Sequence, residues 1–415
     1  MSARMSVPRA TGVLACALLL PSALAPISAF EALRETSRAE MRGLWVVRTA
    51  LVSPQEVDRV VDAAADAGFN ALFVQARGRG DAFYRSSIVS RRPLLERQPR
   101  DFDPLGRLIA RARARRLQVH AWLNVLLTAH FGQPLPHGHV FERHPEWAMV
   151  PRSIASAAFV ATGQRRLRLI LDAGRSEGDV EGYYLSPSLP EVGEHLEAVV
   201  RELVRNYTLD GLHLDFVRYP GPSFDYSRAA LEGFRRARGG SDTLGGPARN
   251  PSGWDDYRRE VLTALTTRLA DAARGERPGI VVSAAVAPDE AQAIHQKFQD
   301  WPRWLDNGVL AALCPMIYTP DNTLFQQQVE LARERARRGQ AVWAGIGAYR
   351  LDPAGLVEKV ELARHSGASG VLLFSHESLD PAHLKLLREQ AFPARVASRR
   401  GAVPSGSGSH AAGSQ

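Results

Sequence analysis

Eight short apolar segments recur along this chain, and stretches with helical periodicity separate most of them. Strands that alternate with helices favour βα units, in which successive strands run parallel. Eight such units predict an α/β fold, a single (β/α)8 TIM barrel that closes on itself. The segments are residues 42–48, 70–77, 118–125, 211–217, 280–287, 311–318, 341–349 and 370–376.

Helix starts between these segments carry capping signals. A serine or aspartate side chain can accept a hydrogen bond from a backbone N–H in the first helical turn, and proline suits the first helical position. Ser53 and Ser188 each open a pattern in which proline and then glutamate follow. Three aspartates directly precede a proline and also predict caps, namely Asp103, Asp352 and Asp380.

Two connections are long, and they follow the third and fourth predicted strands. They run from residue 126 to about 188 and from 221 to about 255. Both would lie at the carboxyl ends of the barrel strands, where the active sites of such barrels are built. Because long loops in that position usually shape substrate binding, we expect both to be functional.

The segment DGLHLDFVRYP, residues 210–220, has the pattern of a buried strand that ends in potentially catalytic polar residues. Leu212 and Leu214 fall on one face at a period of two, whereas His213 and Asp215 fall on the other. In a closed barrel the second face points into the lumen, where polar groups near the end of a strand usually carry chemistry. Asp215 is therefore the first candidate for a catalytic residue.

Polar and aromatic side chains also gather at the ends of the other predicted strands. A barrel interior that needed only packing would use Val, Ile and Leu there, so this concentration predicts a polar cleft. Glycoside cleavage needs two carboxyl groups, one to protonate the leaving oxygen and one to attack the anomeric carbon or activate water. The candidate site residues are Arg77, Asp81, His120, Asn124, His213, Asp215, Arg218, Tyr219, Asp289, Glu290, Tyr318, Asp321 and Glu377.

Several of these residues also have a purely structural interpretation. Asp215 could pair with Arg218 or Arg77 and hold the barrel closed, and His213 could be a hydrogen-bonded core residue. Glu377 could cap the helix that follows it. A metal hydrolase would use His120 and His213 together with Asp215, but the chain has no His-x-x-x-His motif of ligand spacing.

The net charge is +8 and the pI about 9.8, and arginine supplies most of the positive charge. The sequence has no zinc-finger spacing, no aromatic RNA-binding signature and no Walker loop, which argues against a nucleic-acid partner. We expect a monomer that needs no cofactor and no metal and that acts on a polysaccharide or another glycan.

The N-terminal segment has the layout of a secretory signal peptide. Basic residues precede an apolar run over residues 13–24, and small residues end at Ala29. This pattern predicts cleavage after Ala29 and export to the periplasm or the medium. The run is too short and too interrupted by proline for a stable membrane span. Cys16 raises the alternative of a lipoprotein.

The rest of the chain is expected to consist of one folded domain and a C-terminal tail. Residues 40–392 are expected to form the barrel, and the Ser-, Gly- and Ala-rich residues 393–415 are expected to form a disordered tail. After removal of residues 1–29, Cys314 would be the only cysteine, which excludes an internal disulfide. Its apolar surroundings in the sequence indicate a buried, unreactive thiol.

A set of motifs, in order along the chain, resembles the bacterial glycosyl hydrolase-like family 10. The resemblance covers roughly residues 40–377, and the motifs are specific when taken together. They are MRGLWV (41–46), NALFVQAR (70–77), GDAFY (80–84), HAWLN (120–124), YLSP (184–187), DGLHLDFVRYP (210–220), DWPRWL (300–305) and PMIY (315–318).

The resemblance implies a TIM-barrel hydrolase of exported polysaccharide, and some relatives act on peptidoglycan glycan strands stripped of their peptides. It implies that the main catalytic carboxylate is Asp215, as nucleophile or base. The proton donor is expected to be Asp289 or Glu290. No family motif matches around the fifth strand, so Asp321 and Glu377 are kept as alternative donors.

The supporting roles follow from this assignment. Arg218 and Tyr219 would position Asp215, and Arg77 would favour its ionised form. Sugar hydroxyls would be bound by Asp81, His120, Asn124, His213, Tyr318 and Glu377. The alternative functions are a non-catalytic glycan-binding barrel and a metal-dependent amidohydrolase.

Overall fold

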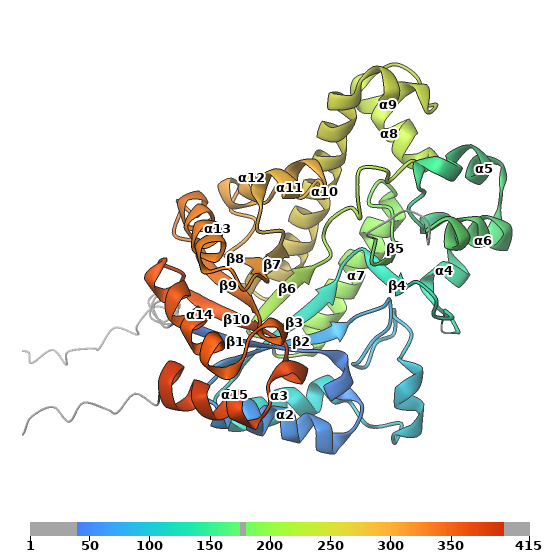
Figure 1. Ribbon diagram of the computed structural model, residues 1–415. Helices are drawn as coiled ribbons and strands as arrows, with labels where there is room; N and C mark the ends of the chain where they lie inside the picture. Colours follow the sequence, from blue (N-terminus) through green and yellow to red (C-terminus); the bar gives the residue numbers. More distant parts are fainter. Residues whose placement is uncertain (1–39, 136, 175–179, 394–415) are drawn as a thin grey trace, which may run out of the picture. The chain divides into compact units, whose positions relative to one another are not determined.

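The computed structural model describes residues 40–135, 137–174 and 180–393 (Figure 1). Within them, eight parallel strands close into a barrel in the order β1-β10-β9-β8-β7-β6-β3-β2. The predicted (β/α)8 fold is therefore confirmed, and each predicted apolar segment overlaps one barrel strand. These strands are β1 (Met41–Val46), β2 (Ala71–Arg77), β3 (Gln118–Asn124), β6 (Gly211–Asp215), β7 (Val281–Val286), β8 (Ala312–Ile317), β9 (Ala341–Gly347) and β10 (Gly370–Phe374).

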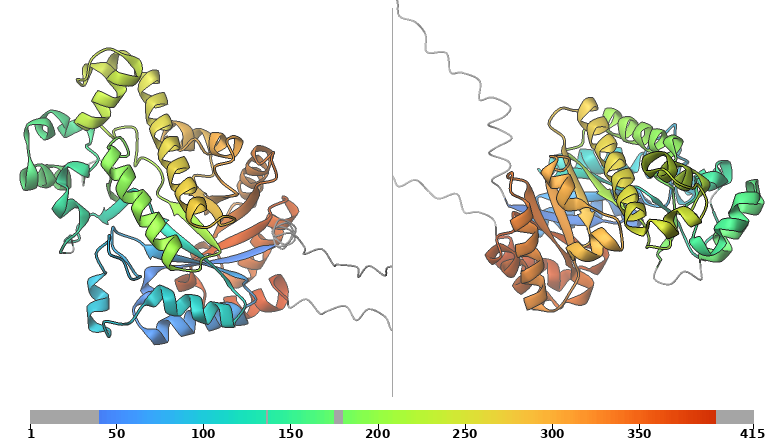
Figure 2. Two further views of the ribbon diagram at one scale, coloured as in Figure 1. Left: turned by 180° about the vertical axis from the view of Figure 1, so that it is seen from behind. Right: turned by 90° about the horizontal axis from the view of Figure 1, so that it is seen from above.

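Helices surround the outer face of the barrel (Figures 1 and 2). The helices of the barrel layer are α2 (Pro54–Asp66), α3 (Pro104–Ala114), α7 (Pro190–Asn206), α10 (Pro251–Glu276), α11 (Glu290–His295), α12 (Trp301–Asp306), α13 (Asn322–Arg335), α14 (Pro353–His365) and α15 (Pro381–Leu386). The predicted signal peptide, residues 1–29, lies outside the described residues, as does the predicted tail apart from residue 393.

The predicted helix caps are mostly correct. Ser53, Asp103, Asp352 and Asp380 each accept a hydrogen bond from a backbone N–H of the helix that they precede. The cap predicted at Ser188 is wrong by one residue, because α7 begins at Pro190 and Leu189 occupies the cap position without a side-chain hydrogen bond.

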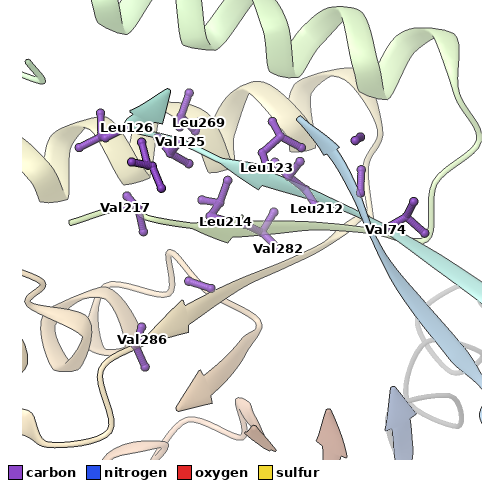
Figure 3. Close-up of a cluster of buried hydrophobic side chains, with 14 of the residues drawn as sticks. Val74, Leu123, Val125, Leu126, Leu212, Leu214, Val217, Leu269, Val282 and Val286 are labelled. Atoms are coloured by element: carbon purple, nitrogen blue, oxygen red, sulfur yellow. The ribbon is translucent and has the colours of Figure 1, made fainter. Parts of the chain in front are cut away.

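The two faces of β6 are buried in different surroundings. Leu212 and Leu214 belong to the large apolar core between the sheet and the helices, together with Leu269 of α10 (Figure 3). His213 lies on the opposite face, inside the barrel, where its ring contacts Trp45 and Phe73. The alternation predicted for this strand therefore follows from closure of the sheet, which leaves one face toward the helices and one toward the lumen.

The lumen is packed with aromatic rings and contains two neutral histidines. Trp45 donates a hydrogen bond from Nε1 to His213 Nε2 at 3.2 Å, and His213 Nδ1 lies 2.9 Å from Ser283 Oγ. His120 stacks on Phe73 with ring centroids 4.4 Å apart and has no hydrogen-bond partner among the described residues. Burial lowers the pKa of each histidine to about 3, so both imidazoles are neutral at physiological pH.

Cys314 is a free thiol in the same layer of the lumen. Burial raises its pKa well above the ordinary value, so the thiol stays protonated. This matches the expectation of an unreactive cysteine.

The two long connections fold into insertions. The first holds α4 (Val140–Arg143), α5 (Ala155–Val160), α6 (Gly163–Gly174) and a two-stranded antiparallel sheet of β4 (Leu127–His130) and β5 (Gly182–Tyr184). The second holds α8 (Arg228–Arg238) and α9 (Gly245–Arg249). Backbone hydrogen bonds join the two insertions, from Arg152 N to Ser223 O at 2.9 Å and from Tyr226 N to Val150 O at 2.8 Å.

We predict that His120→Phe makes the fold less sensitive to acid. The unfolded chain binds a proton at His120 below about pH 6.5, whereas the folded chain does so only near pH 3. Stability is therefore fully present above pH 6.5 and falls by about 1.4 kcal/mol per pH unit toward pH 3. Phenylalanine removes this loss, so the variant should gain up to about 2–3 kcal/mol over the wild type at pH 4.5.

Urea unfolding of both proteins between pH 4 and 8 measures the difference. His137→Phe, which changes an exposed histidine, is the control and should leave the pH dependence as it is. Parallel stability curves for the wild type and His120→Phe would contradict the prediction.

Candidate active site

A pocket opens at the carboxyl ends of the barrel strands. Its volume is about 340 Å³, which is in the usual range for ligand pockets. Six barrel strands contribute side chains at or next to their ends, namely Trp45, Gln75, Asn124, Asp215, Tyr318 and Phe374. This is the end of a (β/α)8 barrel where active sites are found.

Asp215 ends β6 and lines this pocket with only 6% of its surface exposed. Trp122 donates from Nε1 to Oδ2 at 3.0 Å, and the backbone N–H of Phe216 donates to Oδ1 at 2.6 Å. Arg218 Nη1 lies 4.0 Å from Oδ1. Both carboxylate oxygens are therefore held in place, by a donor from the neighbouring strand β3 and by donors from the turn that follows β6.

The turn after Asp215 brings Arg218 back over the strand end. Phe216 has a φ of 50°, a left-handed conformation that is uncommon for a bulky residue. This conformation ends β6, and the Arg218 guanidinium lies 4.3 Å from the centre of the Phe216 ring. Stacking on an aromatic ring restricts the guanidinium to one orientation.

A second carboxylate, Glu181, shares this guanidinium. Arg218 donates from Nη2 to Glu181 Oε1 at 3.0 Å, and the Tyr184 hydroxyl donates to Oε2 at 2.7 Å. Glu181 immediately precedes β5, in the first insertion, and its side chain is 37% exposed. Arg218 thus lies between an enclosed carboxylate on the barrel and a more accessible one on the insertion.

The surroundings shift the pKa values of these carboxyl groups in opposite directions. Burial raises the pKa of Asp215, and it outweighs the opposing effects of Arg218 and of the two hydrogen bonds. Burial also acts to raise the pKa of Glu181, but the charge of Arg218 and the hydrogen bond from Tyr184 prevail and lower it. Opposed shifts of this kind are typical of an acid and an ionised partner in one site.

The insertion is attached to the barrel close to Asp215. Val125 N donates to Asp215 O at 2.8 Å, which continues the pairing of β3 with β6 by one residue. Leu126 N, at the start of the insertion, then donates to Phe216 O just beyond β6 at 3.3 Å, and Leu185 N donates to Leu126 O at 2.8 Å. The position of Glu181 relative to Asp215 therefore depends on backbone hydrogen bonds between the insertion and the barrel.

The structure brings only part of the predicted site together. Among the sequence-predicted residues, those that line the pocket are Asn124, Asp215, Arg218 and Tyr318. Those that do not line it are Arg77, Asp81, His120, His213, Tyr219, Asp289, Glu290, Asp321 and Glu377.

The expected proton donors have other partners. Asp289 caps α11 by accepting from Gln292 N at 2.7 Å. Glu290 accepts two hydrogen bonds at 2.8 Å from Arg335 of α13. Asp321, an alternative, caps α13 in the same way as Asp289 caps α11. A catalytic role for Asp289 or Glu290 stays a prediction, and neither contacts Asp215 or Arg218 among the described residues.

The other residues outside the pocket are held by nearby groups. Arg77 donates from Nη1 to the backbone oxygens of Asn124 and Val125, and Asp81 pairs with Arg92 at 3.0 Å. Tyr219 is fully buried, and its ring packs edge-on against Phe298. Glu377 accepts a hydrogen bond from the Thr49 hydroxyl.

Sequence reasoning missed Glu181, the partner of Arg218, and the pocket residues Arg48 and His130. Arg79, which also lines the pocket, was among the polar residues expected at the end of the second strand but had no assigned role. Glu181 precedes a strand of three residues, which carries too little periodicity to be predicted. The signal available for Arg79 was its position shortly after the end of β2.

The described part of the chain contains neither a metal-binding cluster nor a membrane-spanning helix. Within it, no three His, Cys, Asp or Glu side chains are grouped so as to hold a metal ion. None of the helices that the structure describes combines the length and the apolar character needed to cross a membrane.

A buried carboxylate in a pocket at the strand ends of a parallel barrel lies where (β/α)8 proteins build their active sites. The sequence pattern of the family Glycosyl hydrolase-like 10 matches residues 40–352. The match covers more than half of the chain, and the protein belongs to this family.

Named relatives are distant in sequence. Glycosyl hydrolase DigH of Escherichia coli K12 is 23% identical over 325 residues, which cover 69% of this chain and 67% of that protein. Glycosyl hydrolase YngK of Bacillus subtilis is 23% identical over 319 residues, which cover 68% of this chain and 54% of that protein. Both carry the name of a glycosyl hydrolase.

Solved structures share the fold. The glycoside hydrolase domain of PgaB (BpsB) from Bordetella bronchiseptica has a TM-score of 0.64 at 15% identity and covers 86% of this chain and all of that domain. Alpha-L-fucosidase isoenzyme 2 from Paenibacillus thiaminolyticus has a TM-score of 0.58 at 18% identity, with 84% of this chain and 48% of that protein covered. At these identities the likeness is one of fold.

We predict that Asp215→Asn changes how stability depends on pH. The raised pKa means that the unfolded chain ionises Asp215 at its ordinary value, whereas the folded chain keeps the proton to a higher pH. Wild-type stability is fully present below the ordinary pKa and falls by about 1.4 kcal/mol per pH unit up to the raised value. The variant lacks this loss, so its unfolding free energy should rise relative to the wild type across that window and then stay level.

Chemical unfolding at a series of pH values measures the difference. Asp172→Asn, at an exposed position on α6, is the control for loss of a carboxylate. A difference between Asp215→Asn and the wild type that does not change with pH would contradict the raised pKa.

Proposed function

We propose that this protein is an exported glycoside hydrolase that cleaves O-glycosidic bonds of a polysaccharide at the pocket around Asp215. The observation that carries the proposal is the pair of carboxylates, Asp215 and Glu181, on either side of one arginine at the barrel mouth. Two carboxyl groups in different environments are what glycoside cleavage requires.

In the proposed reaction Asp215 is the proton donor and Glu181 is the ionised partner. Asp215 gives its proton to the glycosidic oxygen as the bond to the anomeric carbon breaks. Glu181 takes a proton from the water that attacks this carbon, or forms a glycosyl ester that water then cleaves. This reverses the role expected for Asp215 from the sequence, because a buried carboxyl favours the protonated form.

The other pocket residues suit a sugar. Asn124 and Tyr318 offer polar groups for hydroxyls, and the rings of Trp45, Trp122 and Phe374 line the pocket beside them. The family resemblance implies a polysaccharide substrate, and because some relatives act on the glycan strands of peptidoglycan, these strands are the substrate that we propose to test. Export, which residues 1–29 predict, would bring the protein to such a polymer.

The proposal predicts that Asp215→Asn folds but loses hydrolysis of peptide-free peptidoglycan glycan strands. Loss of general acid catalysis typically lowers kcat by about 100- to 10,000-fold. On an aryl glycoside, whose leaving group needs no proton, the same variant should keep much more of its activity. New reducing ends and circular dichroism measure the two effects.

Full activity of Asp215→Asn on glycan strands would refute its assignment. A wild type that binds the strands and releases no reducing ends, even at high concentration and long times, would instead identify a non-catalytic glycan-binding barrel.

Glu181→Gln should lower kcat on the glycan strands by a similar factor, about 100- to 10,000-fold, and it should also lower activity on the aryl glycoside. The reason is that the ionised partner is needed whichever group leaves. The steady-state rates on the two substrates therefore separate the role of Glu181 from that of Asp215.

Glu197→Gln is a matched control, because Glu197 also pairs with arginines, Arg201 and Arg268, but on the outer face of α7. It should have wild-type activity. Loss of activity in Glu290→Gln with an unchanged Glu181→Gln would restore the donor expected from the sequence and contradict the pair proposed above.

A further inference from the structure

A small side cavity adjoins the proposed catalytic pocket. Its free space is only about 20 Å³, roughly enough for a single water molecule, and its wall includes Arg79, Arg92, His130 and Gln133. Arg79 and His130 also line the main pocket, so the two spaces share these side chains. Arg48 also lines the main pocket, where its guanidinium is hydrogen bonded to Gln75.

Positive charge is in excess around this cavity. Three arginines, Arg48, Arg79 and Arg92, act electrostatically on one buried carboxylate, that of Asp81. Both oxygens of the Asp81 carboxylate already have partners. One pairs with Arg92 at 3.0 Å, and the other accepts a hydrogen bond from Arg79 N at 2.9 Å. Among the described residues, Arg48 and Arg79 form no ion pair with a carboxylate.

The partners of Arg48 and Arg79 are neutral side chains. Arg48 donates from Nη1 to Gln75 Oε1 at 2.9 Å, and Arg79 donates from Nη1 to Gln133 Oε1. Glu377 acts on Arg48 from a distance, but its own hydrogen bond is to Thr49. A side-chain amide leaves the charge of a guanidinium uncompensated.

The charges of these arginines oppose one another. Burial, together with the charges of Arg48 and Arg92, lowers the pKa of Arg79 to about 10. Guanidinium groups still remain charged at neutral pH, so the repulsion is not relieved by loss of a proton. An anion placed between them would relieve it.

We propose that Arg79, with Arg48, forms a subsite at the edge of the main pocket for a carboxylate carried by a sugar of the substrate. Both side chains line this pocket. Planar guanidinium groups match carboxylates in geometry and hold them with charge-assisted hydrogen bonds. The proposal rests on the proposed function for its substrate and assigns the recognition of charge to residues outside the catalytic pair.

The test compares two forms of one probe. Peptide-free peptidoglycan glycan strands carry a carboxylate on alternate sugars, and reduction of these carboxylates to alcohols gives a neutral polymer of the same length. The wild type should prefer the acidic strands by about 10- to 100-fold in kcat/KM, as expected for hydrogen bonds to a charged group. The preference should be carried by KM and should weaken as salt is raised.

Arg79→Gln should remove most of this preference by raising KM for the acidic strands, with kcat and the rate on neutral strands little changed. Arg79→Lys should recover part of it, because it restores the charge without the planar fork. Arg113→Gln, an exposed arginine on α3, is the matched control and should keep the full preference.

Two outcomes would overturn the subsite. One is a wild type that treats acidic and neutral strands alike, and the other is an Arg79→Gln variant that weakens both to the same extent. If the wild type hydrolyses neither polymer, the proposed function fails, and binding of the two polymers to Asp215→Asn with and without Arg79→Gln still decides the subsite. Equal binding in all four cases would then exclude it.

Discussion

Closure of the parallel sheet is the constraint from which the rest of this structure follows. A closed sheet has no free edge and only one interior, so alternate side chains of every strand must enter the same lumen. In this protein the lumen is filled at depth by rings such as Trp45 and Phe73 around the neutral imidazole of His213. Asp215 lies two residues after His213 on the same face of β6. Its side chain therefore reaches the open end of the lumen, where the pocket begins.

The chemistry of the pocket depends on how charge is shared there. One guanidinium, that of Arg218, contacts Glu181 directly and Asp215 at a longer distance. The shorter contact favours the ionised form of Glu181, whereas the longer one does not overcome the desolvation of Asp215. Opposed protonation states at one site thus arise from the placement of a single cation, which the left-handed conformation of Phe216 makes possible.

Much of the fold could be predicted from the sequence, because strands and their alternation are local properties. The parity of β6 and the cap at Ser53 depend on neighbours a few residues away, and both were predicted correctly. The site was predicted less completely. Asp215 lies on a strand whose direction follows from the fold, whereas Glu181 lies on an insertion whose docking depends on contacts distant in the sequence. Strand ends are also common places for helix caps, which is the position that Asp289 occupies.

The attachment of the β4–β5 sheet has a consequence for thermal behaviour. Strand β5 of this sheet directly follows Glu181, and the buried side chains Leu127 and Tyr184 of the sheet belong to the same apolar core as Leu212 of the barrel. Segments open on their own mainly where they bury few apolar contacts, so this sheet should open together with the barrel. In the proposed mechanism, heating would therefore abolish activity and melt the barrel in a single transition.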